Sequence, residues 1–296
     1  MIIDTHVHIG KVGKFSMPID MVLSSMEKYN IDFSLISNIE GLEYDDNQNF
    51  IDIKFQVSQK KINEEAIEFA KSNKNKIGIL LWTKPSTEGA NEEFENLIIN
   101  NRDIVYGIKV HPFHSKTPFN SDKVEEYIKL AEKYDLPILT HTANDYCSDP
   151  KRVYNMALKY PNVSFIMGHI ALGTDNEEAM GYISKLPNLY GDTAWVTPEK
   201  AKEFVEKCGA EKLLFGSDNP IDGLDTYAHK EFYNIYFNEF KAIVGEKDYN
   251  KIMDYIEERM ENRVKPDFGE NPQIYFENLI EREKTELVEM LAREGK

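Results

Sequence analysis

The sequence lacks several features that define large classes of protein. It contains only two cysteines, Cys147 and Cys208, which form neither a disulfide framework nor a Cys-x-x-Cys site. No apolar run is long enough to cross a bilayer, and the first residues indicate a strand rather than a basic signal peptide. We therefore expect a cytoplasmic protein that does not associate with a membrane.

Positive charge is also scarce. The chain has 35 lysines and arginines against 51 aspartates and glutamates, which gives a formal net charge of -16. A nucleic-acid-binding protein would need a basic surface to meet phosphates, so the net charge argues against this class. Apolar and aromatic content are ordinary for a globular protein, and the length suits one large α/β domain or two small ones. We expect a small-molecule substrate as the partner.

Strands and helices are predicted to alternate along most of the chain. The run Lys76 to Trp82 is almost entirely apolar, as is typical of a parallel strand buried on both faces. Eight such units favour a (β/α)8 barrel of the TIM type. An open doubly wound sheet is the alternative, but it would normally have a glycine-rich phosphate loop after its first strand, and His6 to Gly10 lacks that spacing. The predicted strands cover residues 1–10, 31–37, 76–82, 104–110, 136–140, 163–168, 188–192 and 212–218.

Two regions depart from this alternation. The polar segment 40–59 is too long for a simple connection, which suggests a lid or an insertion. Beyond Gly223 the pattern changes to helices at 230–244, 249–263 and 274–292. We expect residues 1–264 to form the barrel with its closing helices and residues 265–296 to form a C-terminal helical extension. This extension could cover the barrel base or contribute to a homodimer.

Histidines gather at the ends of the predicted strands. His6 and His8 are two residues apart in a strand, so they share a face and lie about 7 Å apart at the backbone. That pair alone is as compatible with chance as with metal binding, but six of the seven histidines fall near strand ends. In a barrel these ends meet at one rim, and imidazoles with a carboxylate are what a divalent metal requires. The residues are His6 and His8 at the end of the first strand, Lys109 and His111 at the end of the fourth, His141 at the end of the fifth, His169 at the end of the sixth and Asp218 at the end of the eighth.

The segments that hold these residues resemble the amidohydrolase superfamily over about residues 1–223. More narrowly, they are similar to its amidohydrolase-2 branch, which includes aminocarboxymuconate-semialdehyde decarboxylase-like enzymes. The resemblance implies a distorted barrel with one catalytic divalent metal, usually zinc. Its ligands would be the residues that match His6, His8, His141 and Asp218. The segments are Asp4-Thr-His-Val-His-Ile-Gly10, Gly107-Ile-Lys-Val-His-Pro112, Pro137-Ile-Leu-Thr-His-Thr142, Gly168-His169 and Leu214-Phe-Gly-Ser-Asp-Asn-Pro220.

The resemblance also implies roles for the catalytic residues. Asp218 would take a proton from metal-bound water, and His169 would orient or protonate the substrate. Both roles are chemically sound, because zinc lowers the pKa of bound water to about 7 and a nearby carboxylate can accept its proton. His169 is followed by Ile170-Ala-Leu-Gly173, whereas many relatives place two glycines directly after this histidine.

Three further residues are candidates for substrate binding. Lys109 has three interpretations: a carbamylated lysine bridging a second metal, a free lysine pairing with a substrate carboxylate, or a lysine facing solvent. His111 could line the pocket or hydrogen-bond the loop turned by Pro112. Trp195 could wall the pocket or pack in the core.

The sequence therefore predicts a metal-dependent hydrolase of a small polar substrate, in which metal-bound hydroxide attacks an amide, a lactone or a related C–N or C–O bond. The alternative is a metal-dependent, non-oxidative decarboxylase of a small carboxylated substrate, because it would use the same residues. A third interpretation is a non-catalytic metal-binding barrel. An open rim of histidines argues against it, because a structural site would be closed by four ligands.

Overall fold

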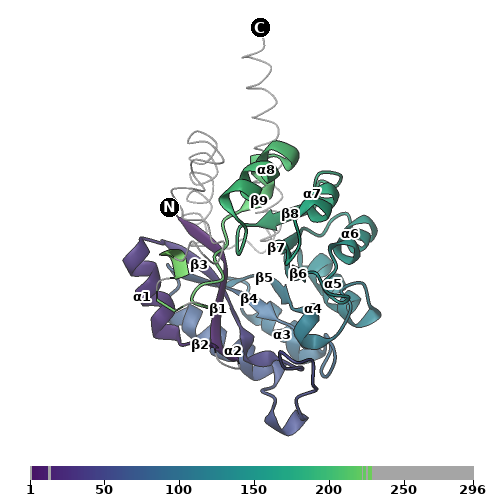
Figure 1. The fold of residues 1–296 in the computed structure, drawn as a ribbon. Coiled ribbons are helices and arrows are strands. Elements are labelled where there is room, and N and C mark those ends of the chain that lie inside the picture. The colour runs from purple at the N-terminus through teal and green to yellow at the C-terminus, as the bar shows by residue number, and fades with distance from the viewer. Residues whose placement is uncertain (1, 13–14, 222, 225, 229–296) are drawn as a thin grey trace.

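Strands and helices alternate along the chain, with the sheet inside and the helices around it (Figure 1). The structure, a computed structural model, describes residues 2–12, 15–221, 223–224 and 226–228. The strands are β1 (Ile3–Val12), β2 (Phe15–Met17), β3 (Phe33–Asn38), β4 (Ile77–Trp82), β5 (Val105–Val110), β6 (Ile138–Ala143), β7 (Phe165–Leu172), β8 (Leu189–Asp192) and β9 (Leu213–Leu214).

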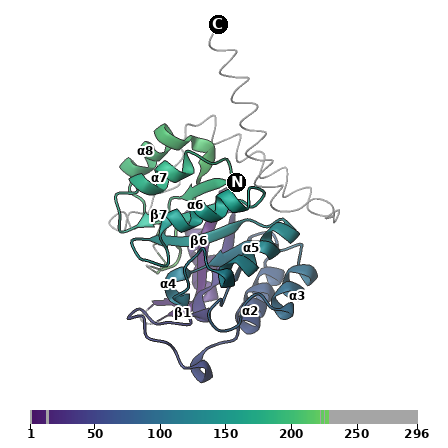
Figure 2. The same ribbon diagram turned by 90° about the vertical axis from the view of Figure 1, so that its right-hand side faces the viewer.

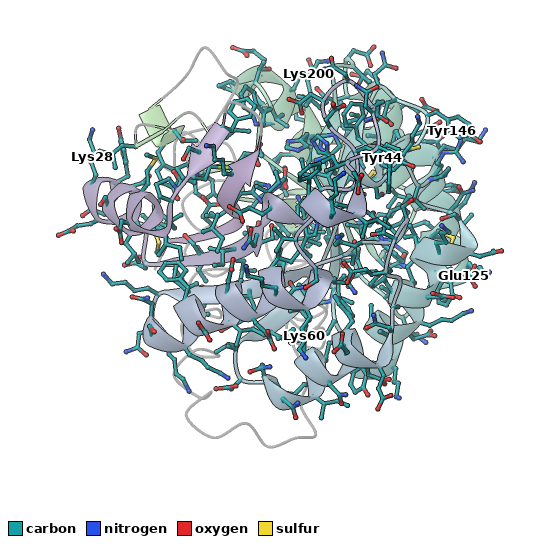
Figure 3. The ribbon with its side chains drawn as sticks, turned by 90° about the horizontal axis from the view of Figure 1, so that it is seen from below. Lys28, Tyr44, Lys60, Glu125, Tyr146 and Lys200 are labelled. Carbon is teal, nitrogen blue, oxygen red and sulfur yellow. The ribbon has the colours of Figure 1, made fainter. Side chains whose placement is uncertain are left out.

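The helices lie outside the curled sheet, as a view turned by 90° also shows (Figure 2). From below, Lys28 and Glu125, on two of these helices, lie at the outer edge of the molecule (Figure 3). The helices are α1 (Ile19–Tyr29), α2 (Gln59–Ser72), α3 (Glu92–Asn100), α4 (Pro112–Ser115), α5 (Asp122–Tyr134), α6 (Pro150–Lys159), α7 (Glu177–Ile183) and α8 (Pro198–Cys208). Single 3-10 turns are η1 (Ile39–Gly41), η2 (Ile53–Phe55), η3 (Ala210–Lys212) and η4 (Thr226–Ala228).

The strand order is β2-β1-β3-β4-β5-β6-β7-β8-β9, and all neighbours are parallel except β1 and β2. The chain after β9 returns to β1 and joins the two ends of this sheet. The Asp218 N–H donates to the His6 carbonyl at 2.8 Å, and the His8 N–H donates to the Asn219 carbonyl at 2.8 Å. An open doubly wound sheet has no such closure, so the predicted barrel is confirmed.

The barrel is distorted at the place where it closes. β9 has two residues, and most of its pairing with β1 passes to the segment that follows it. β2 and α4 are additions that the sequence did not predict. Three and four residues are too short to show a period, and β2 forms because the long strand β1 folds back on itself.

Burial explains why the predicted strands form. Every residue of β3, β4 and β5 is buried, which confirms a parallel sheet covered by helices on one face and filled with side chains on the other.

Local signals set the helix ends. Ser121 caps α5 by accepting from the Val124 N–H, and Gly209 follows α8 with a φ of 95° that favours glycine.

The polar segment 40–59 is partly ordered by the turn after β5. The backbone N–H groups of Glu43 and Tyr44 both donate to the His114 carbonyl, at 3.1 and 2.9 Å. The segment leaves the barrel between η1 and α2 and projects away from it (Figure 1).

The C-terminal predictions fall on a part of the chain that the structure does not describe. The expected helices at 230–244, 249–263 and 274–292, and the boundary between residues 264 and 265, lie outside the described residues. Among the helices that are described, none has the length and apolar character needed to cross a membrane.

Candidate active site

A cavity of about 700 Å³ opens at the carboxyl ends of the barrel strands. It collects residues that are far apart in the chain, because parallel strands bring their carboxyl ends to one rim. Every candidate site residue predicted from the sequence lines this cavity: His6, His8, Lys109, His111, His141, His169, Trp195 and Asp218.

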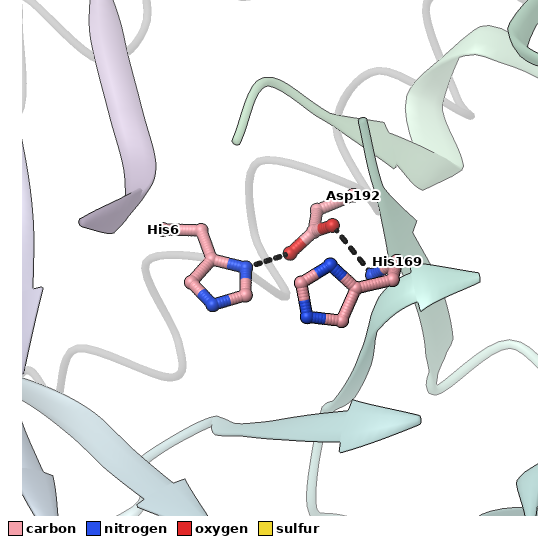
Figure 4. Close-up of side chains that lie close together, drawn as sticks. All are labelled: His6, His169 and Asp192. Carbon is pink, nitrogen blue, oxygen red and sulfur yellow. Dashed lines mark hydrogen bonds and ion pairs between the residues drawn. The ribbon is translucent and has the colours of Figure 1, made fainter. Parts of the chain in front are cut away.

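A buried carboxylate that the sequence analysis did not select supports one of the histidines that line the cavity. Asp192, at the end of β8, is fully buried and holds His6 through Oδ2, which lies 2.7 Å from the His6 Nδ1 (Figure 4). Its Oδ1 accepts from the backbone N–H groups of His169 at 2.8 Å and Ala194 at 3.2 Å. A carboxylate behind a histidine fixes the proton on the nearer nitrogen and leaves the farther one free as a ligand. Asp192 therefore orients His6.

Close packing at this point needs glycine in the neighbouring strands. A Cβ on Gly216 would lie 2.9 Å from the His6 Cβ and 3.2 Å from the Asp192 Cβ. A Cβ on Gly168 would lie 3.3 Å from the His6 ring. The two glycines let the barrel wall approach the His6–Asp192 pair.

Asp218 lies between two histidines and a tryptophan. Its Oδ1 is 3.0 Å from His8 Nε2 and 3.4 Å from His6 Nε2, and its Oδ2 accepts from the Trp195 indole N–H at 2.7 Å. The far side of His8 is held by Ser37, whose hydroxyl is 2.9 Å from Nδ1. Burial opposes ionisation of Asp218, but the neighbouring histidines outweigh it and hold the pKa of this carboxyl well below its usual range. Asp218 is thus an oriented carboxylate at neutral pH.

Lys109 enters the same space from β5. It is 1% exposed, and its Nζ lies 2.6 Å from the His6 Nε2. The interpretation of Lys109 as a solvent-facing lysine is therefore wrong, because the side chain points into the barrel. Burial lowers the pKa of Lys109 to about 8, although the charges of Asp218 and Asp192 act in the opposite direction.

His111 and His141 stack against each other on the other side of the cavity. Their ring centroids are 4.2 Å apart with an interplanar angle of 12°. His111 also accepts from the His114 N–H through Nδ1 at 3.4 Å, in the turn that Pro112 begins. Both sequence interpretations of His111 therefore hold, since it lines the pocket and bonds to this turn. Burial is the main cause that lowers the pKa of both imidazoles well below the ordinary value. Repulsion from nearby positive groups, among them Lys109, lowers it further.

His169 is held by its backbone and by one ring nitrogen. Its Nδ1 lies 3.2 Å from the Ala194 carbonyl, which can only accept, so Nδ1 carries the proton and Nε2 is free. Burial lowers the pKa of His169 to about 4. At neutral pH this imidazole is a neutral acceptor on the cavity side.

Two groups of described residues have the chemistry and spacing to hold a metal ion: His6 with His8 and Asp218, and His6 with His169 and Asp192. Zinc ligands at tetrahedral angles lie about 3.3 to 3.5 Å apart. The separation of Asp218 Oδ1 from His6 Nε2, 3.4 Å, matches this, and that from His8 Nε2, 3.0 Å, is slightly shorter, so the first group could hold a divalent ion after a small adjustment. His141 belongs to neither group, and its place as a fourth ligand stays a prediction.

Lys109 restricts how such an ion would bind. The lone pair of His6 Nε2 faces Lys109 Nζ at 2.6 Å, which is where a ligand bond would form. A charged ammonium beside a dication is strongly repelled. A metal on His6 therefore requires Lys109 to shift or to become neutral.

The geometry defines a parallel barrel whose rim carries histidines and carboxylates. A model of the family described as "Amidohydrolase" matches residues 3–252 of the sequence. The chain belongs to this family, as the sequence resemblance indicated. It is therefore an enzyme of the hydrolase or carboxy-lyase type, in a family that depends on metal. A search of curated proteins found no match.

Solved structures agree on the fold at low sequence identity. One is 5-carboxyvanillate decarboxylase from Novosphingobium aromaticivorans with bound manganese: TM-score 0.59, 9% identity, covering 81% of this chain and 96% of that one. Another is 2,6-dihydroxybenzoate decarboxylase from Rhizobium: TM-score 0.56, 15% identity, coverage 82% and 95%. A third is a probable 2-pyrone-4,6-dicarboxylic acid hydrolase from Acinetobacter baumannii: TM-score 0.54, 14% identity, coverage 82% and 92%.

Proposed function

We propose that this protein is a metal-dependent hydrolase that cleaves an amide, a lactone or a related C–N or C–O bond of a small polar substrate. The position of Asp218 carries the proposal. Its carboxylate lies within 3.4 Å of His6 and His8, is held from behind by Trp195 and faces the cavity. We propose His6, His8, Asp218 and, as a further ligand, His141 as the residues that hold one divalent ion, zinc.

The bound ion would supply a Lewis acid that polarises a carbonyl and lowers the pKa of water. The residues of the chain would then do the rest. Asp218 would accept the proton of the attacking water. The Trp195 indole would hold one oxygen of this carboxylate in place while it does so. His169 offers an unprotonated Nε2 that can accept a hydrogen bond from the substrate or from water. It can protonate a leaving group only after it has taken up a proton itself.

One feature of the cavity argues against a substrate that carries several carboxylates. Among the described residues that line it, Lys109 is the only lysine or arginine, and this lysine already contacts His6. A substrate that carries several carboxylates would usually be met by arginine or lysine side chains. Decarboxylation remains the second candidate, because two of the similar structures are decarboxylases of carboxylated aromatic compounds.

The proposal is tested on protein reconstituted with zinc or with manganese. Hydrolysis of a panel of lactones and amides is compared with release of carbon dioxide from carboxylated aromatics. We expect hydrolysis, and we expect Asp218→Asn to abolish it while Asp122→Asn, an exposed carboxylate in the first turn of α5, retains it. Carbon dioxide release without hydrolysis would favour the second candidate. Failure to bind any divalent metal would refute both.

The proposed function also suggests which partners the protein has and where it acts. We propose a cytoplasmic enzyme that takes a small molecule and binds neither nucleic acid nor membranes. The homodimer suggested by the C-terminal segment stays a prediction, and the mass of the protein in solution tests it.

A further inference from the structure

Asp4, in β1, carries a fully buried carboxyl group to which the proposed chemistry gives no role. Its Oδ1 accepts from the backbone N–H groups of His6 at 3.1 Å and Ser217 at 3.2 Å. Its Oδ2 accepts from the Ser217 hydroxyl, and from the Tyr227 hydroxyl at 2.9 Å. One carboxyl group thus joins the first strand to the segment that follows β9, although 213 residues separate Asp4 from Ser217 along the chain.

The His6 end of this contact coincides with an irregularity in β1. The strand has two residues between Asp4 and Val7, whereas β3 has only one between the residues that pair with them. Such a bulge interrupts the ladder of backbone hydrogen bonds and redirects the side chains beside it. Asp4 Oδ1 accepts from the His6 N–H inside this bulge, so it helps to fix the direction in which the His6 ring leaves the strand.

The Ser217 end of the contact supports a strained backbone at Asp218. This residue has a φ of 63°, a left-handed conformation that is unfavourable for a side chain with a Cβ. The Ser217 N–H donates to Asp4, and the Asn219 N–H donates to the Ser217 hydroxyl at 3.0 Å. The Asp218 N–H between them donates to the His6 carbonyl at 2.8 Å. Because a strained residue keeps its conformation only while its surroundings impose it, the direction of the Asp218 carboxylate depends on these bonds.

We propose that Asp4 is a positioning residue for the metal site, which sets the spacing between His6 and Asp218 by holding the backbone of both segments. The inference rests on the proposed function, because that function places a divalent ion between these two side chains. His6 Nε2 and Asp218 Oδ1 lie 3.4 Å apart, as two ligands of one zinc ion would. Asp4 is not among the described residues that line the cavity, so it acts through the two ligands.

Two substitutions of Asp4 separate positioning from stability. Asp4→Asn keeps an oxygen that can accept from both N–H groups, and its NH₂ group can donate to the hydroxyls of Ser217 and Tyr227. Asp4→Ala removes both acceptors. Asn188→Ala is the control for lost stability, because the buried Asn188 side chain also ties the backbone together. It donates to three carbonyls at and beyond the end of α6, none of them in a residue that lines the cavity.

Zinc affinity is measured by titration of each metal-free protein in competition with a chelator, and stability by denaturant titration of the same proteins. We expect Asp4→Ala to weaken zinc binding about tenfold or more, and Asp4→Asn to bind within about threefold of the native protein. Asn188→Ala should lose stability and keep the native affinity. The visible spectrum of the cobalt-loaded protein reports the geometry of the ligands, and among these variants we expect it to change only in Asp4→Ala.

Three results would overturn the inference: native zinc affinity in Asp4→Ala, equal losses of affinity in Asp4→Asn and Asp4→Ala, or an equal loss in Asn188→Ala. If Asp4→Ala does not fold, Ser217→Ala decides, because it removes the hydroxyl that contacts Asp4. We expect it to bind zinc about threefold more weakly, and native affinity would contradict the inference. A native protein that binds neither zinc nor cobalt refutes the proposed metal centre, whereas native binding that these variants leave unchanged overturns the inference alone.

Discussion

Replacing Asp192 by asparagine tests how the second carboxylate controls the site. The change keeps the size of the side chain but turns one of its two oxygens into an NH₂ group. Asp192 Oδ1 accepts from two backbone N–H groups, and its Oδ2 faces His6 Nδ1 at 2.7 Å. The amide oxygen is needed at the backbone pair, so the NH₂ group is directed at His6. A donor there forces His6 to accept at Nδ1 and to carry its proton on Nε2.

The change would affect the nitrogen of His6 that faces the proposed metal site. Nε2 is the atom that faces Asp218 and Lys109, and a protonated Nε2 has no lone pair for a metal. Loss of such a supporting group typically lowers metal affinity about 10-fold to 100-fold. This corresponds to about 1.4 to 2.7 kcal/mol at 25 °C. Burial already raises the pKa of Asp192, so we expect a smaller effect on the stability of the metal-free fold, because a disfavoured charge is removed.

The assay is a titration of metal-free protein with zinc in competition with a chelator of known affinity. Nitrogen NMR of labelled imidazoles reports which ring nitrogen of His6 carries the proton. Ser37→Ala is the control, because it removes the neutral hydrogen bond at His8 Nδ1 and should weaken zinc binding less. An Asp192→Asn protein that is folded, binds zinc within twofold of the native value and keeps its proton on Nδ1 would refute the reasoning.

Three other changes have defined outcomes. Trp195→Phe removes the indole donor to the proposed catalytic carboxylate, and we expect kcat to fall about 10-fold to 100-fold with the fold intact; an unchanged kcat would contradict its positioning role. Burial raises the pKa of Glu43 to about 6 from 4.5, so the folded protein binds more protons and the free energy of unfolding falls by about 2 kcal/mol as pH rises between these values. Denaturant titrations should show that Glu43→Gln removes this dependence, and an identical pH profile would contradict it. Gly216→Ala places a Cβ 2.9 Å from the His6 Cβ and should lower the free energy of unfolding by about 1 to 3 kcal/mol, whereas Gly181→Ala, with open space around it, should not.

The general position of the site was predictable because it depends on topology. Residues at the carboxyl ends of parallel strands meet at one rim whatever the side chains between them are. A run such as Ile77–Trp82 could be recognised as a buried strand from its apolar character alone. The eight residues selected on this basis do line one cavity. Their roles as ligands, acids or bases depend on distances that strand ends do not specify.

Asp192 illustrates what the sequence did not disclose. It ends a predicted strand, as the selected histidines do, and that position was the only signal available. Its function depends on the approach of β8 to His6, which small residues such as Gly216 allow. Lys109 is similar, because its contact with His6 depends on the direction of a long side chain across the barrel. Such contacts require the registers of several strands at once, and no single segment of sequence contains them.

A left-handed turn within the carboxyl end of β7 explains how this chain fixes His169 without the glycines expected there. His169, Ile170 and Ala171 have φ angles of 66°, 48° and 68°, a left-handed conformation that costs about 1 to 2 kcal/mol per residue with a Cβ. Thr142 accepts from the Ala171 N–H at 2.9 Å, and the Asn176 side chain donates to the Ile170 carbonyl at 2.6 Å. Ile170 and Ala171 are also buried, which offsets part of the cost. Glycines would adopt this turn without strain but would also leave it more easily. The strained turn, held by these side chains, therefore keeps His169 in one orientation toward the cavity.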